Sequence, residues 1–268
     1  MKNKCLRVWV LIASLAWLPV AHAETSTSFV LCIPGGPGST VDAQSVVDRF
    51  LNTLRDGTDL GPAAGAYYTD FASCAQALKK PADKRFVMIP LNVYLRERKA
   101  WQLRALVQVD TAKTSGQYHV VAPKGETLES LRGKRWVTGL KLKAPFLSRV
   151  AFDGRVALAP EGLKHLRSSL SAIKRVAKGR ADVVIVDDLQ RKSMASLPIA
   201  NELVVVHSGP DLPEAIVAVV GASKTKKLKK ALLSLCQKHK ALCTELRVTR
   251  FRAVTDKQLT QLEQKLTP

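Results

Sequence analysis

The chain has 268 residues, of which 46% are hydrophobic, and its 42 lysines and arginines outnumber its 22 aspartates and glutamates to give a formal net charge of +20. A charge of this size attracts acidic partners such as anionic ligands, lipid head groups or anionic polymers. The histidines and cysteines have no zinc-site spacing, and no C-x-x-C motif occurs, so a zinc site is not expected.

The N-terminus is typical of a secretory leader. Lys2, Lys4 and Arg7 precede an apolar core at 8–18, and a small-x-small motif ends at Ala23. Residues 1–23 are therefore predicted to be a signal peptide cleaved near Ala23, which places the protein in the periplasm. Removal of 23 from 268 residues leaves 245, enough for one large or two smaller cores, and removal of three basic residues from +20 leaves +17. No later stretch is long and uncharged enough to insert in a membrane.

Four cysteines remain after the leader, and an even number in an oxidising compartment predicts two disulfides. Cys236 and Cys243 form the favoured local pair, but seven residues of continuous helix would separate them by roughly 10 Å. This exceeds the reach of a disulfide. If the pair forms, the helix must break near His239, and Cys32–Cys74 is then the remaining pair.

The first half of the chain alternates strands and helices. Strands are predicted at 29–33, 66–68, 86–89 and 103–109, with helices beginning near Ala43 and Thr69. Between the first strand and helix lies a Gly/Pro loop at 33–42, in which Ser39 and Asp42 have the spacing of a capping box. Its glycines match neither a dinucleotide fingerprint nor a phosphate loop. A second candidate ligand loop is 90–94. This order indicates an α/β fold with a mostly parallel sheet.

The second half repeats the pattern on a smaller scale. Strands are predicted at 118–121, 133–139, 155–159, 181–186, 203–207 and 215–220, and helices at 127–131, 145–152 and 163–179. A helix near 224–235 concentrates lysines, for which a solvated face is the simpler explanation than a polyanion site. Leu259, Leu262 and Leu266 mark a last helix.

Four segments in this order resemble the periplasmic substrate-binding proteins of the phosphate, phosphite and phosphonate type. They are 34–40 (PGGPGST), 128–135 (LESLRGKR), 179–187 (GRADVVIVD) and 212–214 (LPE), followed by the lysine-rich helix. The resemblance implies a two-lobed, type 2 Venus-flytrap fold with mixed β-sheets flanked by helices. Lobe one would comprise 24–112 and 202–268, and lobe two 113–201, with crossings near Ser115 and Asn201.

In this fold, ligands bind between the lobes at strand carboxyl ends and helix N-termini. The resemblance carried over to individual positions predicts the ligand-binding residues Ser39, Thr40, Asn92, Tyr94, Thr138, Gly139, Ser148 and Asp187. One departure is the loop that opens the lobe-two helix. The family typically has serines and glycines there, whereas this chain has Lys141 and Lys143, which could neutralise an anion in another way.

The resulting prediction is an exported, monomeric solute-binding protein. It captures a small anionic or zwitterionic, phosphonate-like ligand between its lobes for an ABC importer, with a permease as partner and without a cofactor, a metal or a nucleic acid. The alternative is a basic envelope protein of the same fold that binds polyanions or a protein. An enzyme is not expected: Ser39, His119 and Asp187 can be drawn as a triad, but no G-x-S-x-G elbow surrounds any serine.

Overall fold

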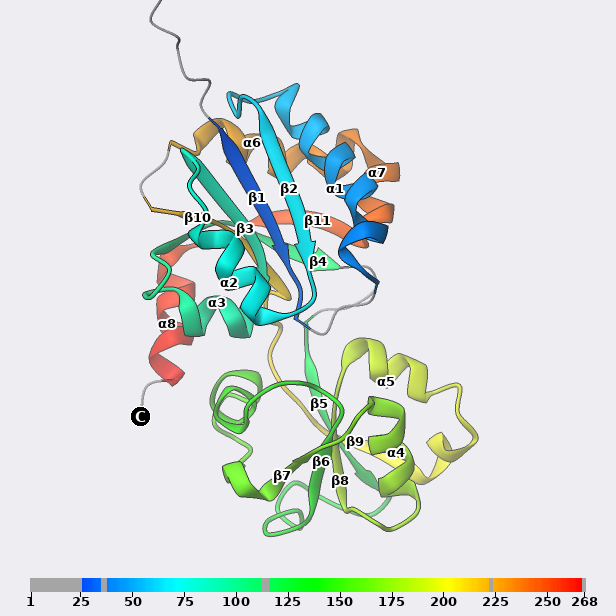
Figure 1. Cartoon of the computed structure of the whole chain (residues 1–268). Helices are drawn as coiled ribbons and strands as arrows, with labels where there is room; N and C mark the ends of the chain where they lie inside the picture. The colour runs from blue at the N-terminus through cyan, green and yellow to red at the C-terminus, as the bar shows by residue number, and fades with distance from the viewer. Residues whose placement is uncertain (1–25, 35–37, 112–115, 222–223, 267–268) are drawn as a thin grey trace, which may run out of the picture.

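Two separate β-sheets divide the chain into two lobes (Figure 1). The computed structural model describes residues 26–34, 38–111, 116–221 and 224–266. The predicted leader at 1–23 and the loop residues 35–37 lie outside the described residues. Within the described part, no helix has the length and apolar character needed to cross a membrane.

The sheet of lobe one has six strands in the order β11-β4-β10-β3-β1-β2. β1 runs parallel to both β2 and β3, whereas β10 is antiparallel to β3 and β4, so the sheet is mixed. The bounds are β1 (Thr27–Cys32), β2 (Ala63–Tyr68), β3 (Lys84–Pro90), β4 (Leu103–Thr111), β10 (Ala215–Val220) and β11 (Val248–Ala253).

Helices cover both faces of this sheet, because its central strands β1, β3, β4 and β10 contain runs of consecutive buried residues. One face packs against α1 (Thr40–Arg55), α6 (Lys226–Lys238) and α7 (Lys240–Glu245). The other packs against α2 (Phe71–Lys79), α3 (Leu91–Glu97) and α8 (Asp256–Leu266). The predicted capping box at α1 is confirmed: the Ser39 hydroxyl accepts from the Asp42 amide at 3.2 Å, and the Asp42 carboxylate accepts from the Ser39 amide at 3.1 Å.

The sheet of lobe two has five strands in the order β7-β6-β8-β5-β9. β6 is parallel to β7 and β8, and β5 is antiparallel to β8 and β9. The strands are β5 (Tyr118–Pro123), β6 (Trp136–Thr138), β7 (Leu163–His165), β8 (Val183–Asp187) and β9 (Leu203–Ser208). The helices are α4 (Ser169–Ala177), α5 (Asp188–Met194), the π-helix η1 (Phe146–Ala151) and the 3₁₀ turns η2 (Pro160–Gly162) and η3 (Pro198–Glu202).

The boundary predicted near Asn201 is wrong, because β9 belongs to lobe two. Its residues pair with β5, for example Val120 with His207. The return crossing therefore lies between Ser208 and Ala215, where β10 joins the other sheet. Two apolar strands separated by a short turn look alike in the sequence, and only the long-range pairing decides which sheet each one joins.

Four local predictions also need correction. The candidate loop at 90–94 is the start of α3, and 127–131 forms turns rather than a helix. The strand predicted at 155–159 is absent from the described residues there, and β7 instead lies within the start of the helix predicted at 163–179. β7 has only three residues, with Leu163 buried and the next two exposed, which is too short to show an alternating pattern.

Both favoured disulfides are present. Cys32–Cys74 ties the end of β1 to α2 with 5.7 Å between the Cα atoms, and Cys236–Cys243 joins α6 to α7 with 5.5 Å. The helix breaks at His239, whose φ of −129° and ψ of 62° are not helical. The break brings the second pair within reach, as the spacing requires.

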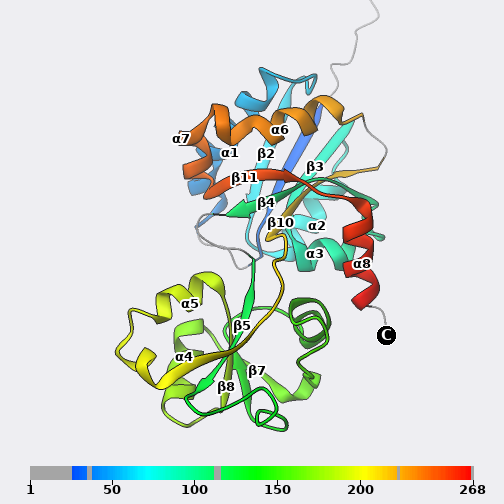
Figure 2. The ribbon, with the colours of Figure 1, turned by 180° about the vertical axis from the view of Figure 1, so that it is seen from behind.

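Residues 112–115 of the first crossing, including the predicted crossing near Ser115, lie outside the described residues, but the crossing's last part, next to β5, lies beside the return crossing (Figure 2). Gly116, just before β5, has a φ of +73°, and a Cβ atom at this position would lie 1.9 Å from the Leu212 carbonyl oxygen on the return crossing. Only glycine permits this approach. The two connections are therefore in contact where they enter the interlobe region.

Candidate functional site

A pocket of about 220 Å³ lies between the lobes, where the crossings meet. Its walls come from the end of β4, the start of β5, the β8–α5 junction and the residue before β10. The lining residues are Thr111, Gly116, Gln117, Tyr118, Asp187, Asp188, Leu189 and Glu214.

Three of these eight residues are acidic, and no lysine or arginine is among the described residues that line the pocket. The negative lining contrasts with the formal charge of +20 on the whole chain. Carboxylates in a concave, partly desolvated site favour a cationic group or strong hydrogen-bond donors. The local electrostatics of the pocket therefore differ in sign from those of the surface.

Asp187 ends β8 and is also the N-cap of α5. Its carboxylate accepts from the Gln190 amide at 2.8 Å, and the Gln190 side chain accepts from the Asp187 amide at 3.2 Å, which completes a capping box. Burial raises the pKa of Asp187, and this effect outweighs the lowering by the Gln190 amide. One carboxylate thus caps a helix and contributes negative charge to the pocket.

Glu214 faces the pocket from the return crossing. Thr111 donates a hydrogen bond to its Oε2 atom, while its Oε1 atom is buried without a hydrogen-bond partner in the described structure. Burial is the main cause that raises the pKa of Glu214, with further contributions from Asp110, Asp187 and Asp188. A buried acceptor without a donor is costly, so Glu214 is suited to accept a hydrogen bond from a guest.

Asp188 belongs to a buried hydrogen-bonded chain. His119 on β5 contacts Asp188 Oδ1 through Nε2 and Ser208 Oγ through Nδ1, both at 2.8 Å. Arg191 Nε lies 3.8 Å from the same carboxylate, and the Gln117 amide donates to it at 3.3 Å. The network links β5, β9 and α5, so its main effect is to hold the strands that lead to both crossings.

This chain has the residue types of a nucleophilic triad but differs from the one drawn from the sequence. His119 contacts Ser208 and Asp188, not Ser39 and Asp187. A triad also needs donors for an oxyanion. The Gly209 amide next to Ser208 already donates to the Tyr118 carbonyl at 2.9 Å. The pocket lining includes neither His119 nor Ser208.

Two side chains give the pocket an apolar part. The Tyr118 ring meets Phe146 edge-on, with 6.1 Å between the ring centroids, and Leu189 is 58% exposed beside the carboxylates. Burial raises the pKa of Tyr118, so its hydroxyl stays protonated and can donate a hydrogen bond. The pocket combines negative charge, one phenolic donor and apolar surface.

Among the eight predicted ligand-binding residues, Asp187 alone is in this pocket lining. Ser39 caps α1, as described above, and the Thr40 hydroxyl donates to the Tyr67 carbonyl at 2.7 Å. Both residues are exposed at the N-terminal end of α1, the end that points toward lobe two (Figure 1).

Asn92 and Tyr94 lie on α3 rather than on a loop. Asn92 is partly buried, whereas Tyr94 is completely buried in the core of lobe one, with the guanidinium carbon of Arg98 5.9 Å from its ring centroid. Tyr94 therefore packs inside the lobe and does not reach the pocket.

The predicted residues of lobe two form local structure. The Thr138 hydroxyl donates to the Ile185 carbonyl at 2.9 Å and accepts from the Leu140 amide at 3.0 Å. A Cβ atom on Gly139 would lie 2.2 Å from the Ser169 amide nitrogen, so glycine permits the close packing of α4. Ser148 donates to the Val156 carbonyl at 2.5 Å.

Sequence reasoning missed most of the pocket lining. Asp188 follows Asp187 directly, and two acidic residues after a buried strand are a signal that could have included both. Glu214 lies in the 212–214 turn that carried the family resemblance without being assigned to the site. Thr111 and Tyr118 had no such signal, because their proximity depends on the two chain crossings.

Two α/β lobes joined by two crossings, with a pocket between them, define the architecture of periplasmic binding proteins. The chain belongs to the family of periplasmic phosphonate substrate-binding proteins of ABC transporters, whose sequence model matches residues 40–259. The family consists of binding proteins rather than enzymes, and it is periplasmic. No curated protein sequence gives a significant match.

Solved structures support the fold. XAC2383 from Xanthomonas citri bound to ATP is similar with a TM-score of 0.65 and 16% identity, covering 89% of this chain and 96% of that one. PhnD1 from Prochlorococcus marinus in complex with methylphosphonate has a TM-score of 0.58 and 16% identity, covering 89% and 96%. A binding component of an ABC phosphonate transporter from Pseudomonas aeruginosa has a TM-score of 0.58 and 15% identity, covering 90% and 85%.

Proposed function

We propose that this chain is a solute receptor that captures a small zwitterion between its lobes and delivers it to an ABC permease. The ligand carries a phosphonate-like anion and an amine. The single observation that supports the amine is the buried Oε1 atom of Glu214, which has no hydrogen-bond partner among the described residues and lies in a pocket shared with Asp187 and Asp188. An ammonium group would supply the missing donor and offset the negative charge.

The anionic end is supported by the edge of the sheet beside this pocket. β6 runs parallel to β8, with Thr138 opposite Ile185, so the residues that follow both strands lie at the same sheet edge. Lys141 and Lys143 follow β6 and are exposed. We assign these two lysines, together with the exposed N-terminus of α1 at Ser39 and Thr40, to the anion.

A thermal unfolding panel tests the ligand class. The mature protein is heated with phosphate, methylphosphonate, an aminoalkylphosphonate, an alkylsulfonate, glycine or a polyamine. The aminoalkylphosphonate is expected to give the largest rise in Tm, because a ligand at a hundredfold excess over its Kd stabilises the native state by about 2.7 kcal/mol. An equal or larger rise with methylphosphonate would contradict the role of the amine.

Charge-removing variants test the pocket. Asp187→Asn keeps a good N-cap residue, and Glu214→Gln keeps the shape of the side chain. Each is expected to weaken aminoalkylphosphonate binding at least about tenfold in calorimetry, since loss of one partner of a desolvated charge pair costs about 2–5 kcal/mol. Asp70→Asn, which changes the N-cap residue of α2 outside the proposed site, is the matched control. Unchanged affinity in both pocket variants would rule out the carboxylates as the amine site.

Export and transport are also part of the proposal. Family membership supports a permease partner, and the sequence supports cleavage near Ala23. Mass spectrometry of the exported protein should find a chain that begins near Glu24. Cells that lack the protein should lose uptake of the ligand identified in the panel.

A further inference from the structure

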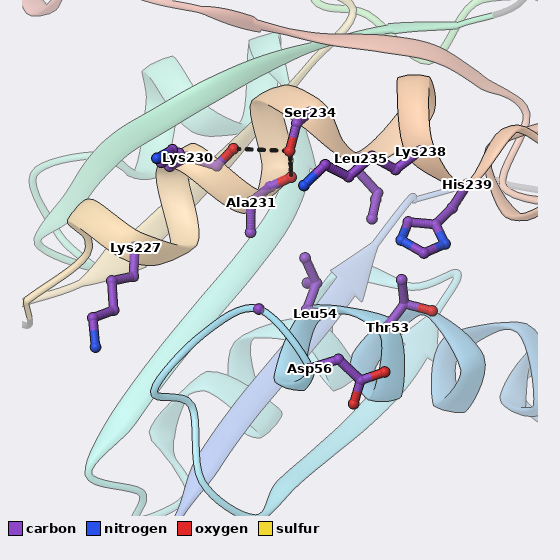
Figure 3. Close-up of a pocket in the computed structure, with 11 residues that line it drawn as sticks. Thr53, Leu54, Asp56, Lys227, Lys230, Ala231, Ser234, Leu235, Lys238 and His239 are labelled. Carbon is purple, nitrogen blue, oxygen red and sulfur yellow. Dashed lines mark hydrogen bonds between the residues drawn. The ribbon is translucent and has the colours of Figure 1, made fainter.

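A second hollow, of about 550 Å³, lies on lobe one between the C-terminal part of α1 and α6 (Figure 3). It shares no lining residue with the interlobe pocket and lies at the end of the lobe away from lobe two (Figure 1). A volume of this size is typical of small-molecule sites. The residues that bear on its chemistry are Asp56, Lys227, Lys230, Ser234, Lys238 and His239.

The cationic side of the hollow follows from helical spacing. Lys227, Lys230, Ser234 and Lys238 are separated by three, four and four residues, which places them along one face of α6. The adjoining face buries Leu228, Leu232 and Leu235 in the core of lobe one, and Leu235 also reaches the hollow. α6 contains no acidic residue, so neighbouring lysines repel one another, which destabilises a helix.

Some other cations of the chain have a carboxylate partner. Lys265 pairs with Asp153 at 2.5 Å, and Arg135 pairs with Asp182 at 2.8 Å. In the part of the chain that the structure describes, the three lysines of the hollow have no ion pair, and the one carboxylate in the lining, Asp56, pairs with none of them. Counted with His239 neutral, the lining has a net charge of +2.

The floor of the hollow is apolar. Leu54 and Leu235 are buried, with 0% and 3% of their surfaces exposed, and Ala231 lies between the lysine-bearing turns. The Ser234 hydroxyl donates within the helix to the Lys230 and Ala231 carbonyls at 3.3 Å. Its lone pairs are not used in these two bonds. At the far end, the helix break next to the Cys236–Cys243 disulfide exposes His239.

We propose that this hollow is a second binding site, for the phosphate group of a phosphate ester that carries an apolar part. Lysine binds phosphate as a point charge, and a hollow lined by three lysines and by apolar side chains fits a ligand with a charged end and a hydrophobic end. The site goes beyond the proposed function, because it uses no residue of the interlobe pocket. A soluble phosphate ester and a phospholipid at a membrane surface share this chemistry.

The test compares two variants with the same loss of charge. The hollow variant is Lys227→Gln, Lys230→Gln and Lys238→Gln; the control is Lys79→Gln, Lys80→Gln and Lys178→Gln, at exposed lysines outside the hollow. Phenyl phosphate binding is measured by calorimetry, and recruitment to phosphatidylcholine vesicles with and without phosphatidylglycerol by co-sedimentation. The substituted lysines are exposed, and circular dichroism checks that each variant is folded.

The hollow variant is expected to lose about tenfold in affinity, equivalent to about 1.4 kcal/mol, because it lacks all three lysine charges of the hollow, while the control stays within about twofold of the unmodified protein. Binding of phenyl phosphate identifies a soluble ligand, and recruitment only by phosphatidylglycerol identifies a membrane lipid. Equal losses in both variants would reduce the effect to net charge and overturn the proposal. Lack of binding to either probe would overturn it as well, as would binding that the hollow variant retains.

Discussion

Some acidic side chains have pKa values that their surroundings shift in opposite directions. Arg135 holds the pKa of Asp182 down to about 2, and Lys265 lowers the pKa of Asp153, both by hydrogen bonds at the surface. Asp187 and Glu214 have the opposite behaviour, because burial between the lobes raises their pKa. Binding of a charged ligand in the pocket is therefore coupled to the ionisation of these two carboxyl groups.

The raised pKa values predict a pH dependence of ligand binding. An ammonium group interacts best with ionised carboxylates, so affinity for an aminoalkylphosphonate should rise as pH rises through the folded-state pKa values of Asp187 and Glu214, and level off above them. Calorimetric titration from about pH 4 to pH 8 measures this profile. The double variant Asp187→Asn, Glu214→Gln should flatten it, and a flat profile in the unmodified protein would disprove the coupling.

The same groups affect stability with a defined sign. A carboxyl group with a raised folded-state pKa binds more protons in the native than in the unfolded chain, in the window between the two pKa values. Stability contributed by these two groups therefore falls as pH rises through that window. Asp182 acts in the opposite sense: its contribution is present above the unfolded pKa and is lost as pH falls toward about 2.

At the scale of single residues, the sequence could predict site residues that directly follow a long buried strand. Asp187 could be found because five hydrophobic and small residues precede it in 181–186. Thr138 and Ser148 have hydroxyl groups at plausible positions, but backbone carbonyls accept their hydrogen bonds. Glu214 and Thr111 meet across 103 residues of chain. The local sequence around either residue contains no pattern that predicts such a contact.

At the scale of elements, the disulfides act on different lengths of chain. Cys32–Cys74 spans 42 residues and joins β1 to α2, whereas Cys236–Cys243 spans seven residues and holds the junction of α6 and α7. In the chain-entropy model, a longer closed loop restricts the unfolded chain more. The first bridge therefore has the larger expected effect on global stability, and the second acts mainly on local shape.

Replacement of each pair by alanine tests this difference. Loss of Cys32–Cys74 is expected to lower the free energy of unfolding by about 4 kcal/mol, and loss of Cys236–Cys243 by about 2.5 kcal/mol. Urea unfolding of the oxidised proteins measures both values. The unmodified protein under the same oxidising conditions is the reference. An equal or larger loss at the second pair would show that the α6–α7 junction matters more to the fold than chain entropy indicates.

Strands with continuous buried runs could be predicted, and irregular ones could not. β3 and β8 each contain four consecutive buried residues. β11 was missed because its buried residues, Val248 and Phe251, are three positions apart, and a register shift between Val248 and Arg250 accounts for that spacing. A bulge removes the alternation by which a strand is recognised.

At the scale of the whole molecule, the lobes touch at a place away from the interlobe pocket. α8 belongs to lobe one but packs against η1 of lobe two. Lys265 Nζ lies 2.5 Å from Asp153 Oδ1, and Arg149 Nη1 donates to the Leu266 carbonyl at 3.2 Å. Apolar residues of both elements belong to one buried cluster. Movement of the lobes about the crossings must alter this contact.

The variant Lys265→Ala is expected to let the ligand-free lobes separate more often, because it removes the one side-chain ion pair seen across this contact in the described residues. Small-angle X-ray scattering should give a larger radius of gyration. The global stability should change little, since exposed pairs contribute about 0.2–1 kcal/mol. The control is Asp182→Ala, which breaks the Arg135 pair inside lobe two. An increase of equal size in the control would exclude a specific role for α8.

The general plan of two lobes could be predicted from a few segments in order, but the return crossing could not be placed. β9 and β10 are both apolar and lie six residues apart, between Ser208 and Ala215. β9 belongs to lobe two because it pairs with β5, and β10 belongs to lobe one because it pairs with β3 and β4. These partners are distant in the sequence, so the boundary is a property of the folded chain.

The arrangement of the cysteines also bears on how the protein matures. Among the four cysteines that follow the predicted leader, each pairs with its neighbour in the sequence, Cys32 with Cys74 and Cys236 with Cys243. A chain that is exported N-terminus first presents the members of each pair in succession. A dithiol oxidase that joins cysteines as they emerge therefore makes the native bridges directly. Disulfide isomerisation, which proteins with interleaved bridges require, has no wrong pairing to correct.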